Sequence, residues 1–244
     1  VAVPGAGGGH KPRPLSRPTA RPSTRDRLSI EQIVAVDPPT AFRVSPDGRS
    51  VAYLAEAGGA RQLFTMPVRG GYPTQLTAFE KEVSDPQWNA RGDRIAFVKE
   101  KAIWTIDADG GRPTKLVDHP AGNANPRWAP DGDRLLLVSR RRGWDQLWLV
   151  EAPRPTRGRP RAAERPAEPV CLTPTPHDNE SPAWSPDGTR IAFVSQRAED
   201  LLTQQVYVLD VARALAGTAA AVTQVAGDTS WTCAPAWTRE GHGL

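Results

Sequence analysis

Apolar residues in this sequence recur in short runs that alternate with polar residues, a pattern typical of half-buried strands rather than of helices. One such run, Ile95–Val98, is followed closely by a second, Ala102–Ile106, and the same succession returns at Ile191–Val194 and Gln205–Leu209. Similar pairs lie within residues 51–66 and 135–150. Four copies of one strand pattern predict an all-β protein made of a repeated structural unit.

A turn motif precedes each pair of runs, and its fullest form is Trp184-Ser-Pro-Asp-Gly188. Proline sets φ, the carboxylate can accept hydrogen bonds from turn N–H groups, and glycine takes the left-handed position, so the motif predicts a tight turn between two strands. We expect the tryptophan to pack between neighbouring units, where it buries a large apolar area. The structural residues of the repeat are Trp88, Trp128, Trp184 and Trp237, with Gly48, Gly92, Gly132 and Gly188.

Two further strands complete each unit, and four short strands in about 40 residues are the content of one β-propeller blade. The predicted fold class is therefore all-β, a β-propeller with four complete four-stranded blades and the start of a fifth. We expect the partial propeller to occupy residues 28–244, with blades at 41–78, 84–117, 124–173 and 180–226 and the start of the fifth at 233–244. An incomplete ring exposes an unpaired strand edge. We therefore interpret the sequence as a fragment of a longer protein or a truncated gene product, and expect that it can form homo-oligomers.

Four segments depart from the repeat. Residues 1–27 are rich in Pro, Arg, Gly and Ser, which predicts a disordered basic leader. Leu28–Val36 is amphipathic and predicts a short helix with Ser29 as its cap. Residues 151–169 interrupt the third blade with five prolines and are expected to form a surface loop. The alanine-rich run Val211–Ala221 predicts a short helical insertion in the fourth blade.

The formal net charge of +4 comes from two segments. Residues 1–27 hold six Lys or Arg and one Asp, and residues 140–168 hold eight Arg and four acidic residues, so the rest of the chain is net acidic. A nucleic-acid-binding face needs basic residues on the folded elements, so we expect no nucleic acid partner. No apolar run approaches the ~18–20 residues that span a bilayer, so we expect no membrane partner.

The compartment is only weakly indicated by the sequence. Cys171 and Cys233 are too few for a disulfide framework. A cytosolic protein would keep both as free thiols, whereas a secreted protein could pair them. Residues 1–9 lack the positive start and apolar core of a signal peptide. We expect a cytoplasmic protein, with a periplasmic or secreted location as the alternative if a signal precedes the first residue.

The residues of a complete catalytic site are not found. The four histidines do not pair at a metal-ligand spacing, and the cysteines form no Cys-x-x-Cys motif. The nucleophile motif Gly-x-Ser-x-Gly is also missing. We therefore name no catalytic residue and no metal ligand, and we expect no cofactor.

Polar residues beside the predicted first strands are the candidate substrate-binding positions. Asp85 and Asn125 each stand one residue before a proline, and Glu180 ends the polar cluster His177–Glu180. These three side chains could ring one end of the propeller channel and bind the amino terminus of a peptide substrate. The alternative is that they make turn and cap hydrogen bonds. The run Arg140–Arg142 has a similar pair of interpretations, a solvated hairpin tip or a partner contact.

With the repeat laid out, the sequence resembles a known family pattern. The segment Ser181–Ser195, together with Gln205–Asp210, resembles the TolB-like propeller repeat. The order Leu28–Ile33 followed by Phe42–Tyr53 is similar to the opening of the prolyl oligopeptidase family, particularly its dipeptidyl-peptidase and acylaminoacyl-peptidase branches. The resemblance covers about residues 28–241.

The resemblance implies a serine peptidase in which a propeller caps a C-terminal α/β-hydrolase domain. In such enzymes the hydrolase domain supplies a Ser-His-Asp triad and the propeller restricts access to short peptides. This chain lacks the triad motif, so we expect it to be the gating and substrate-positioning propeller and to be inactive by itself. The peptide substrate would be hydrolysed by an α/β-hydrolase domain outside this chain. The alternatives are a TolB-like propeller that binds a protein partner and a free-standing scaffold without an enzyme.

Overall fold

The computed structural model describes residues 38–152, 168–197, 204–218, 221–225, 234–241 and 243–244. All of them belong to one compact unit, Asp37–Leu244. The basic leader, the Leu28–Val36 segment, Cys233 and most of the 151–169 insertion lie outside the described residues.

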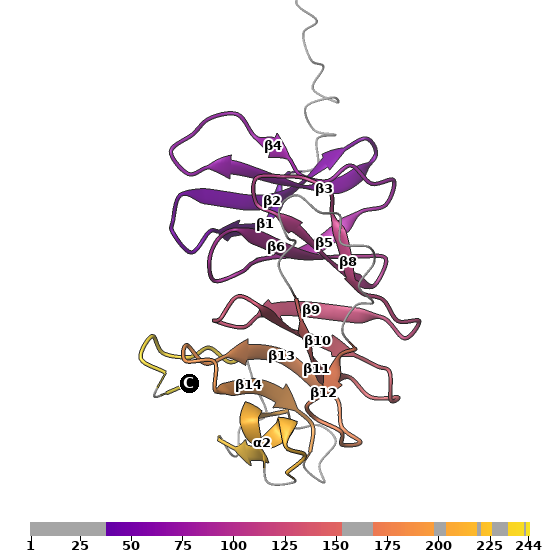
Figure 1. Ribbon diagram of the computed structural model, residues 1–244, viewed down its shortest axis with the longest axis vertical. Coiled ribbons are helices and arrows are strands. Elements are labelled where there is room, and N and C mark those ends of the chain that lie inside the picture. The colour runs from indigo at the N-terminus through magenta and orange to yellow at the C-terminus, as the bar shows by residue number, and fades with distance from the viewer. Residues whose placement is uncertain (1–37, 153–167, 198–203, 219–220, 226–233, 242) are drawn as a thin grey trace, which may run out of the picture. The chain divides into compact units, whose positions relative to one another are not determined.

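The described chain forms four antiparallel sheets of four consecutive strands each. Figure 1 shows these sheets as successive β-propeller blades, and the described residues 234–241, where the sequence predicts the first strand of a fifth blade, contain no strand. Blade 1 consists of β1 (Thr40–Val44), β2 (Ser50–Ala57), β3 (Ala60–Pro67) and β4 (Thr74–Gln75). Blade 2 consists of β5 (Val83–Trp88), β6 (Arg94–Lys99), β7 (Ala102–Asp107) and β8 (Thr114–Val117). Blade 3 consists of β9 (Asn123–Trp128), β10 (Arg134–Ser139), β11 (Gln146–Glu151) and β12 (Val170–Cys171). Blade 4 consists of β13 (Asn179–Trp184), β14 (Arg190–Ser195), β15 (Gln205–Asp210) and β16 (Val222–Gln224).

The first strand of each blade is the innermost strand. Contacts join β1 to β5, β5 to β9 and β9 to β13, so the first strands of successive blades are neighbours. The first residue of each first strand already pairs with the second strand of the same blade. Val83 pairs with Lys99, and Asn179 pairs with Ser195.

The apolar core lies between the blades. Side chains of alternate residues on β6 point to opposite faces of the blade, as strand geometry requires. Ile95 and Phe97 therefore join a cluster with Ala52, Leu54 and Leu63 of blade 1, whereas Ala96 joins one with residues of blade 3. A third cluster joins blades 3 and 4. The fold thus depends on blade-to-blade contact, since no blade buries both of its faces alone.

The turn between the first two strands has the chemistry that its sequence predicts. The Asp187 carboxylate accepts the Ser185 hydroxyl at 2.6 Å and the Thr189 N–H at 3.0 Å. Asp47 accepts the same two bonds in blade 1, at 2.6 and 3.0 Å. Gly188 has φ +70°, in the region that glycine enters without steric cost.

The repeat tryptophans join neighbouring blades, as predicted, and they do so by a specific hydrogen bond as well as by packing. Each indole N–H donates to a main-chain carbonyl of the preceding blade's first strand. The acceptor is always the residue just before the position that aligns with the tryptophan. The four bonds are Trp88 to Arg43 at 2.8 Å, Trp128 to Gln87 at 3.1 Å, Trp184 to Arg127 at 3.2 Å and Trp237 to Ala183 at 3.0 Å.

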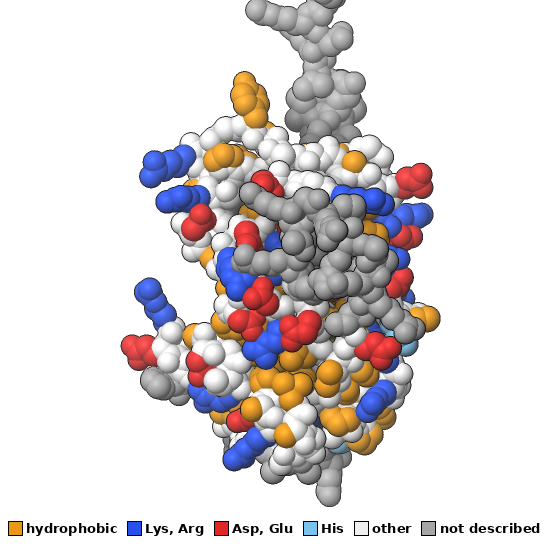
Figure 2. Space-filling model, in the orientation of Figure 1, with side chains coloured by type: hydrophobic (Ala, Val, Ile, Leu, Met, Phe, Trp, Pro, Cys, Tyr) orange, Lys and Arg blue, Asp and Glu red, His pale blue; other side chains and the backbone are white. Residues whose placement is uncertain are grey.

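The helical insertion is shorter than its sequence suggests. Helix α2 spans only Val211–Leu215, and the Asp210 side chain caps it by accepting the Arg213 N–H. Gly217 follows with φ +71°, the left-handed conformation that ends helices. No helix among the described residues is long and apolar enough to cross a bilayer. On the face shown in Figure 2, described Lys and Arg side chains lie among Asp and Glu side chains.

Replacing Trp128 by Phe should lower the free energy of unfolding by about 1–3 kcal/mol, because the Gln87 carbonyl loses its donor and the blade interface loses volume. Urea unfolding of the purified chain measures this change. Trp144→Phe is the matched control, since Trp144 is 43% exposed, and its effect should stay within about 0.5 kcal/mol. Equal effects of the two substitutions would contradict the role assigned to the indole bond.

The stability of the chain should fall in acid partly through Asp187. Hydrogen bonds from Ser185 and Thr189 lower the pKa of this carboxyl from 3.8 to about 2. A folded-state pKa below the unfolded value means that the stabilisation is complete above the unfolded pKa and is lost as the pH falls towards about 2. Asp187→Asn should therefore show a shallower loss of stability between about pH 4 and pH 2 in urea titrations. Ser185→Ala should show an intermediate slope, and identical slopes for all three proteins would refute the assignment.

Candidate functional site: a polar cavity at the innermost strands

Every described first strand carries a bulge at the same position. The pairing register with the second strand shifts between Ser84 and Gln87, and the same shift recurs in the other blades. The bulged residues have positive φ, between 47° and 55°, and they are Ala41, Asp85, Asn125 and Ser181. Asp and Asn are enriched among non-glycine residues with this conformation. A bulge leaves a residue unpaired and redirects its side chain, so this position differs from the rest of the strand.

The bulges correct one alignment made from sequence. Asp85 and Asn125 occupy equivalent positions, but their counterpart in blade 4 is Ser181 and not Glu180. Glu180 pairs with Val194 just as Ser84 pairs with Val98, so it belongs one residue earlier in the repeat. The proline that follows the bulge sets this register. Glu180 is exposed and does not line the cavity described next.

A cavity of about 400 Å³ opens beside the first strands of blades 2, 3 and 4 and the start of blade 5. Its polar lining comes from Asn125 and Ser181 at two bulges and from Gln87 and Arg127, each of which precedes a repeat tryptophan. The remaining lining residues are Trp88, Trp128, Pro182, Ala183, Trp184, Ala234 and Pro235. We call this the inner-strand cavity. It brings amide, hydroxyl and guanidinium groups together beside indole rings, so it offers both donors and acceptors.

Asp85 is held by an ion pair instead of facing the cavity alone. Its Oδ2 lies 3.3 Å from Nη1 of Arg127 on the next blade, and its Oδ1 accepts a hydrogen bond from Gln87 Nε2 at 2.8 Å. The carboxylate therefore connects β5 to β9 and orients the guanidinium that lines the cavity. Sequence reasoning missed Arg127. The signal was its place between the proline and the tryptophan, which is also the place of Gln87 and Ala183.

The Arg140–Arg142 run is more than a solvated turn. Arg141 donates to Asn123 Oδ1 at 2.9 Å and to Ser139 Oγ at 3.2 Å, and its guanidinium lies 5.0 Å from the Trp148 ring centroid. Burial lowers the pKa of Arg141. Arg197 repeats the arrangement in blade 4, with bonds to Asn179 and Ser195. Arg141 and Arg197 therefore each stabilise the hairpin end of their blade.

The described residues contain no group of three or more His, Cys, Asp or Glu side chains that could hold a metal ion. Cys171 carries a free thiol, half-buried on β12, and its Sγ lies 3.4 Å from Gln146 Oε1. Burial raises the pKa of this thiol, which makes it a poor nucleophile at neutral pH. The polar groups that line the inner-strand cavity are amide, hydroxyl and guanidinium groups, which form hydrogen bonds and, for Arg127, carry charge.

Solved structures share this architecture. The putative TolB from Agrobacterium tumefaciens is 22% identical, with a TM-score of 0.56 over 78% of this chain and 66% of that chain. TolB from Acinetobacter baumannii is 18% identical, with a TM-score of 0.57 over 77% of this chain and 43% of that chain. The fold is that of a TolB-like β-propeller.

A peptidase also carries a similar propeller. The puromycin-hydrolyzing peptidase of Mycobacterium tuberculosis is 16% identical, with a TM-score of 0.54 over 72% of this chain and 30% of that chain. No protein-family model matches the sequence, and a search of curated proteins finds no match. At these identities the likeness establishes the fold, and this chain spans only part of the length of each structure.

The Asp85–Arg127 pair should contribute modestly to the blade 2–blade 3 contact. The two side chains are 23% and 31% exposed, so water screens their attraction. We expect a coupling of about 0.2–1 kcal/mol between Asp85→Asn and Arg127→Gln in a double-mutant cycle followed by urea unfolding. A coupling of zero would contradict the prediction that the pair stabilises the contact between blades 2 and 3.

Proposed function

We propose that this propeller binds short peptides at the inner-strand cavity and positions them for a serine-peptidase domain that lies outside this chain. The observation that carries the proposal is the lining of that cavity. The Asn125 amide and the Ser181 hydroxyl can pair with the N–H and C=O groups of a peptide backbone. Arg127 can bind a peptide carboxylate through charge-assisted hydrogen bonds.

The propeller fold of a puromycin-hydrolyzing peptidase supports the peptidase context. In this proposal the chain provides gating and positioning and no catalytic group, so it does not hydrolyse peptides by itself. Asp85 acts indirectly, because it orients Arg127.

A second candidate function is a protein-binding scaffold with no peptidase attached. It is supported by the likeness to the two TolB structures, which covers a larger share of their length than of the peptidase's length. In that case the inner-strand cavity would receive a segment of a partner protein, and a free terminal carboxylate would not be required.

The two functions differ in whether binding requires a free C-terminal carboxylate on the peptide: peptide positioning requires it, and the scaffold does not. Titration of the chain with Ala-Ala-Ala, followed by NMR, should show saturable binding that weakens about tenfold when the peptide is amidated at its C-terminus, a change of about 1.4 kcal/mol. Arg127→Gln should remove this preference, and Asn125→Ala should weaken binding of both peptides. Glu180→Ala is the matched control, because Glu180 is exposed and lies outside the cavity lining.

Binding that ignores the terminal carboxylate but depends on Asn125 would favour the scaffold. Failure of both peptides to bind, or equal loss with Glu180→Ala, would overturn the peptide-positioning proposal.

A further inference from the structure

An arginine begins the second strand in three of the four blades. Arg94, Arg134 and Arg190 occupy the same register, since each pairs with the last residue of the following strand. Each guanidinium lies over the repeat tryptophan of the next blade. The distances from Cζ to the ring centroid are 4.7 Å for Arg94 on Trp128, 5.8 Å for Arg134 on Trp184 and 4.7 Å for Arg190 on Trp237. These distances are within the range of a cation–π interaction.

The guanidinium of Arg94 also closes the interface with hydrogen bonds. Nη2 donates to the Gly132 carbonyl at 2.8 Å, and Nη1 donates to the Ala152 carbonyl at 2.8 Å. The Arg94 side chain is only 4% exposed. Arg190 Nη2 makes the corresponding bond to the Gly241 carbonyl at 2.7 Å. The glycine is that of the next blade's turn motif, so the interface itself forms a receptor for a guanidinium.

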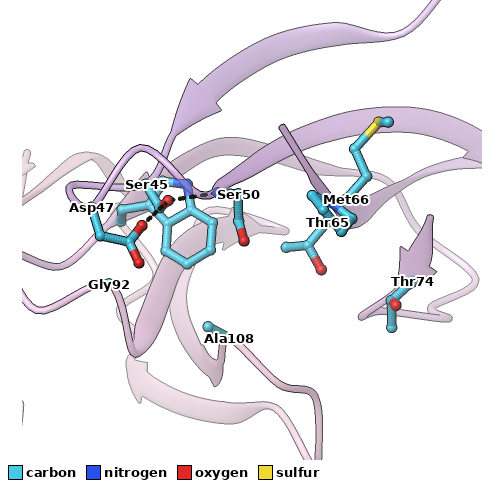
Figure 3. A pocket seen from close by; sticks show the side chains of 10 residues that line it. Ser45, Asp47, Ser50, Thr65, Met66, Thr74, Gly92 and Ala108 are labelled. Carbon is cyan, nitrogen blue, oxygen red and sulfur yellow. Dashed lines mark hydrogen bonds between the residues drawn. The ribbon is translucent and has the colours of Figure 1, made fainter. Parts of the chain in front are cut away.

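Blade 1 has the receptor without the arginine. Ser50 stands in the same register, paired with Pro67 at the end of β3. A cavity of about 210 Å³ remains there, far larger than the roughly 10–15 Å³ that one water molecule requires. Its lining includes Trp88, Gly92 and Ala108 (Figure 3 labels Ser50, Gly92 and Ala108). We call it the blade 1–2 cavity.

The lining of the blade 1–2 cavity includes counterparts of three residues that contact Arg94, although Asp93, the counterpart of its ion-pair partner Asp133, is not part of the lining. Trp88 is the counterpart of Trp128, and Gly92 is the counterpart of Gly132 in the turn motif. Ala108 is the counterpart of Ala152, because the N–H groups of Ala108 and Ala152 donate to Asp93 and Asp133, which are equivalent turn residues. The indole face and two carbonyl-bearing residues that surround a guanidinium in blade 2 are thus repeated around an open space in blade 1.

The charge and access of the cavity suit a cation from outside. Asp47 lines it, and hydrogen bonds from Ser45 and the Arg49 N–H lower the pKa of this carboxyl, so it is ionised at neutral pH. The Asp47 side chain is 54% exposed, which places the mouth of the cavity at the surface. Arg49 Nε lies 3.9 Å from Asp47 Oδ2, but the Arg49 side chain is 86% exposed and is not part of the lining, so this ion pair is screened by water and leaves the cavity open.

We propose that the blade 1–2 cavity binds the guanidinium group of an arginine side chain supplied by another molecule. The indole face, the two carbonyls and the Asp47 carboxylate together select a planar cation with several diverging donors. A lysine ammonium lacks this planar set of donors and stacks less well on an indole. The proposal is independent of the peptide-positioning function, because the two cavities share only Trp88.

The test is titration of the full chain with N-acetyl-arginine amide and with N-acetyl-lysine amide, followed by NMR of the tryptophan indole N–H signals. We expect saturable binding of the arginine compound, at least about tenfold tighter than of the lysine compound, a difference of about 1.4 kcal/mol. The perturbed indole signal should disappear in Trp88→Phe. Equal affinities for the two compounds, or binding of neither, would overturn the proposal.

Ser50→Arg should fill the cavity from within, abolish binding and raise the Tm. Thr223→Arg, which adds the same charge at an exposed position in blade 4, is the matched control and should bind as the wild type does. Asp47→Asn gives a second variant, with binding weakened about fivefold or more, since a charge-assisted bond is lost. If Ser50→Arg folds and binds the arginine compound as the wild type does, the ligand lies elsewhere. If Ser50→Arg does not fold, unchanged binding by Asp47→Asn leads to the same conclusion.

The source of the arginine is distinguished by two further ligands. Tighter binding of an Ac-Gly-Arg-Gly amide peptide than of free L-arginine identifies the natural ligand as a protein segment. The reverse order identifies it as the free amino acid. Both outcomes support a guanidinium site, and binding of neither overturns it.

Discussion

The structure depends on one repeated interaction, the donation of each tryptophan's indole N–H to the preceding blade's innermost strand. The four bonds fall at equivalent positions, from Trp88 to Arg43 through to Trp237 and Ala183. A blade is a twisted sheet with two apolar faces, and neither face is buried without a neighbour. The indole bond aligns the blades in register, and the apolar clusters between them then become continuous.

The inner-strand cavity is a consequence of this alignment. The acceptor carbonyls belong to Gln87, Arg127 and Ala183, and the side chains of the first two residues line the cavity. The bulge that precedes them leaves Asn125 and Ser181 outside the regular strand pairing. Main-chain groups of the first strands thus hold the blades together, while the side chains of Gln87 and Arg127 line the cavity and are oriented by Asp85.

Blade 1 lacks two residue types that recur in the other blades, the tryptophan before the turn and the arginine at the start of the second strand. Val44 replaces the tryptophan and Ser50 replaces the arginine, although strand order and turn geometry are unchanged. The loss of the arginine does not collapse the interface, because Trp88 still bonds to Arg43 and the apolar cluster of blades 1 and 2 is intact. What remains is a cavity of about 210 Å³ whose lining includes Trp88, Gly92 and Ala108, the counterparts of residues that contact Arg94. A structural position in three blades thereby becomes a candidate binding site in the fourth.

The sequence by itself determined the propeller class, the number of complete blades and the turn chemistry. Each of these follows from local patterns, such as strand alternation and the Ser-Pro-Asp-Gly turn, which operate within a few residues. It also singled out Asp85 and Asn125, because residues before the prolines stand out in an aligned repeat. Only the tertiary structure showed that this position, which Pro182 already assigns to Ser181 and not to Glu180 in blade 4, is a bulge. It alone also showed Arg127 paired with Asp85 and the open space beside Ser50, because both depend on residues about 40 positions apart that meet only when blades pack together.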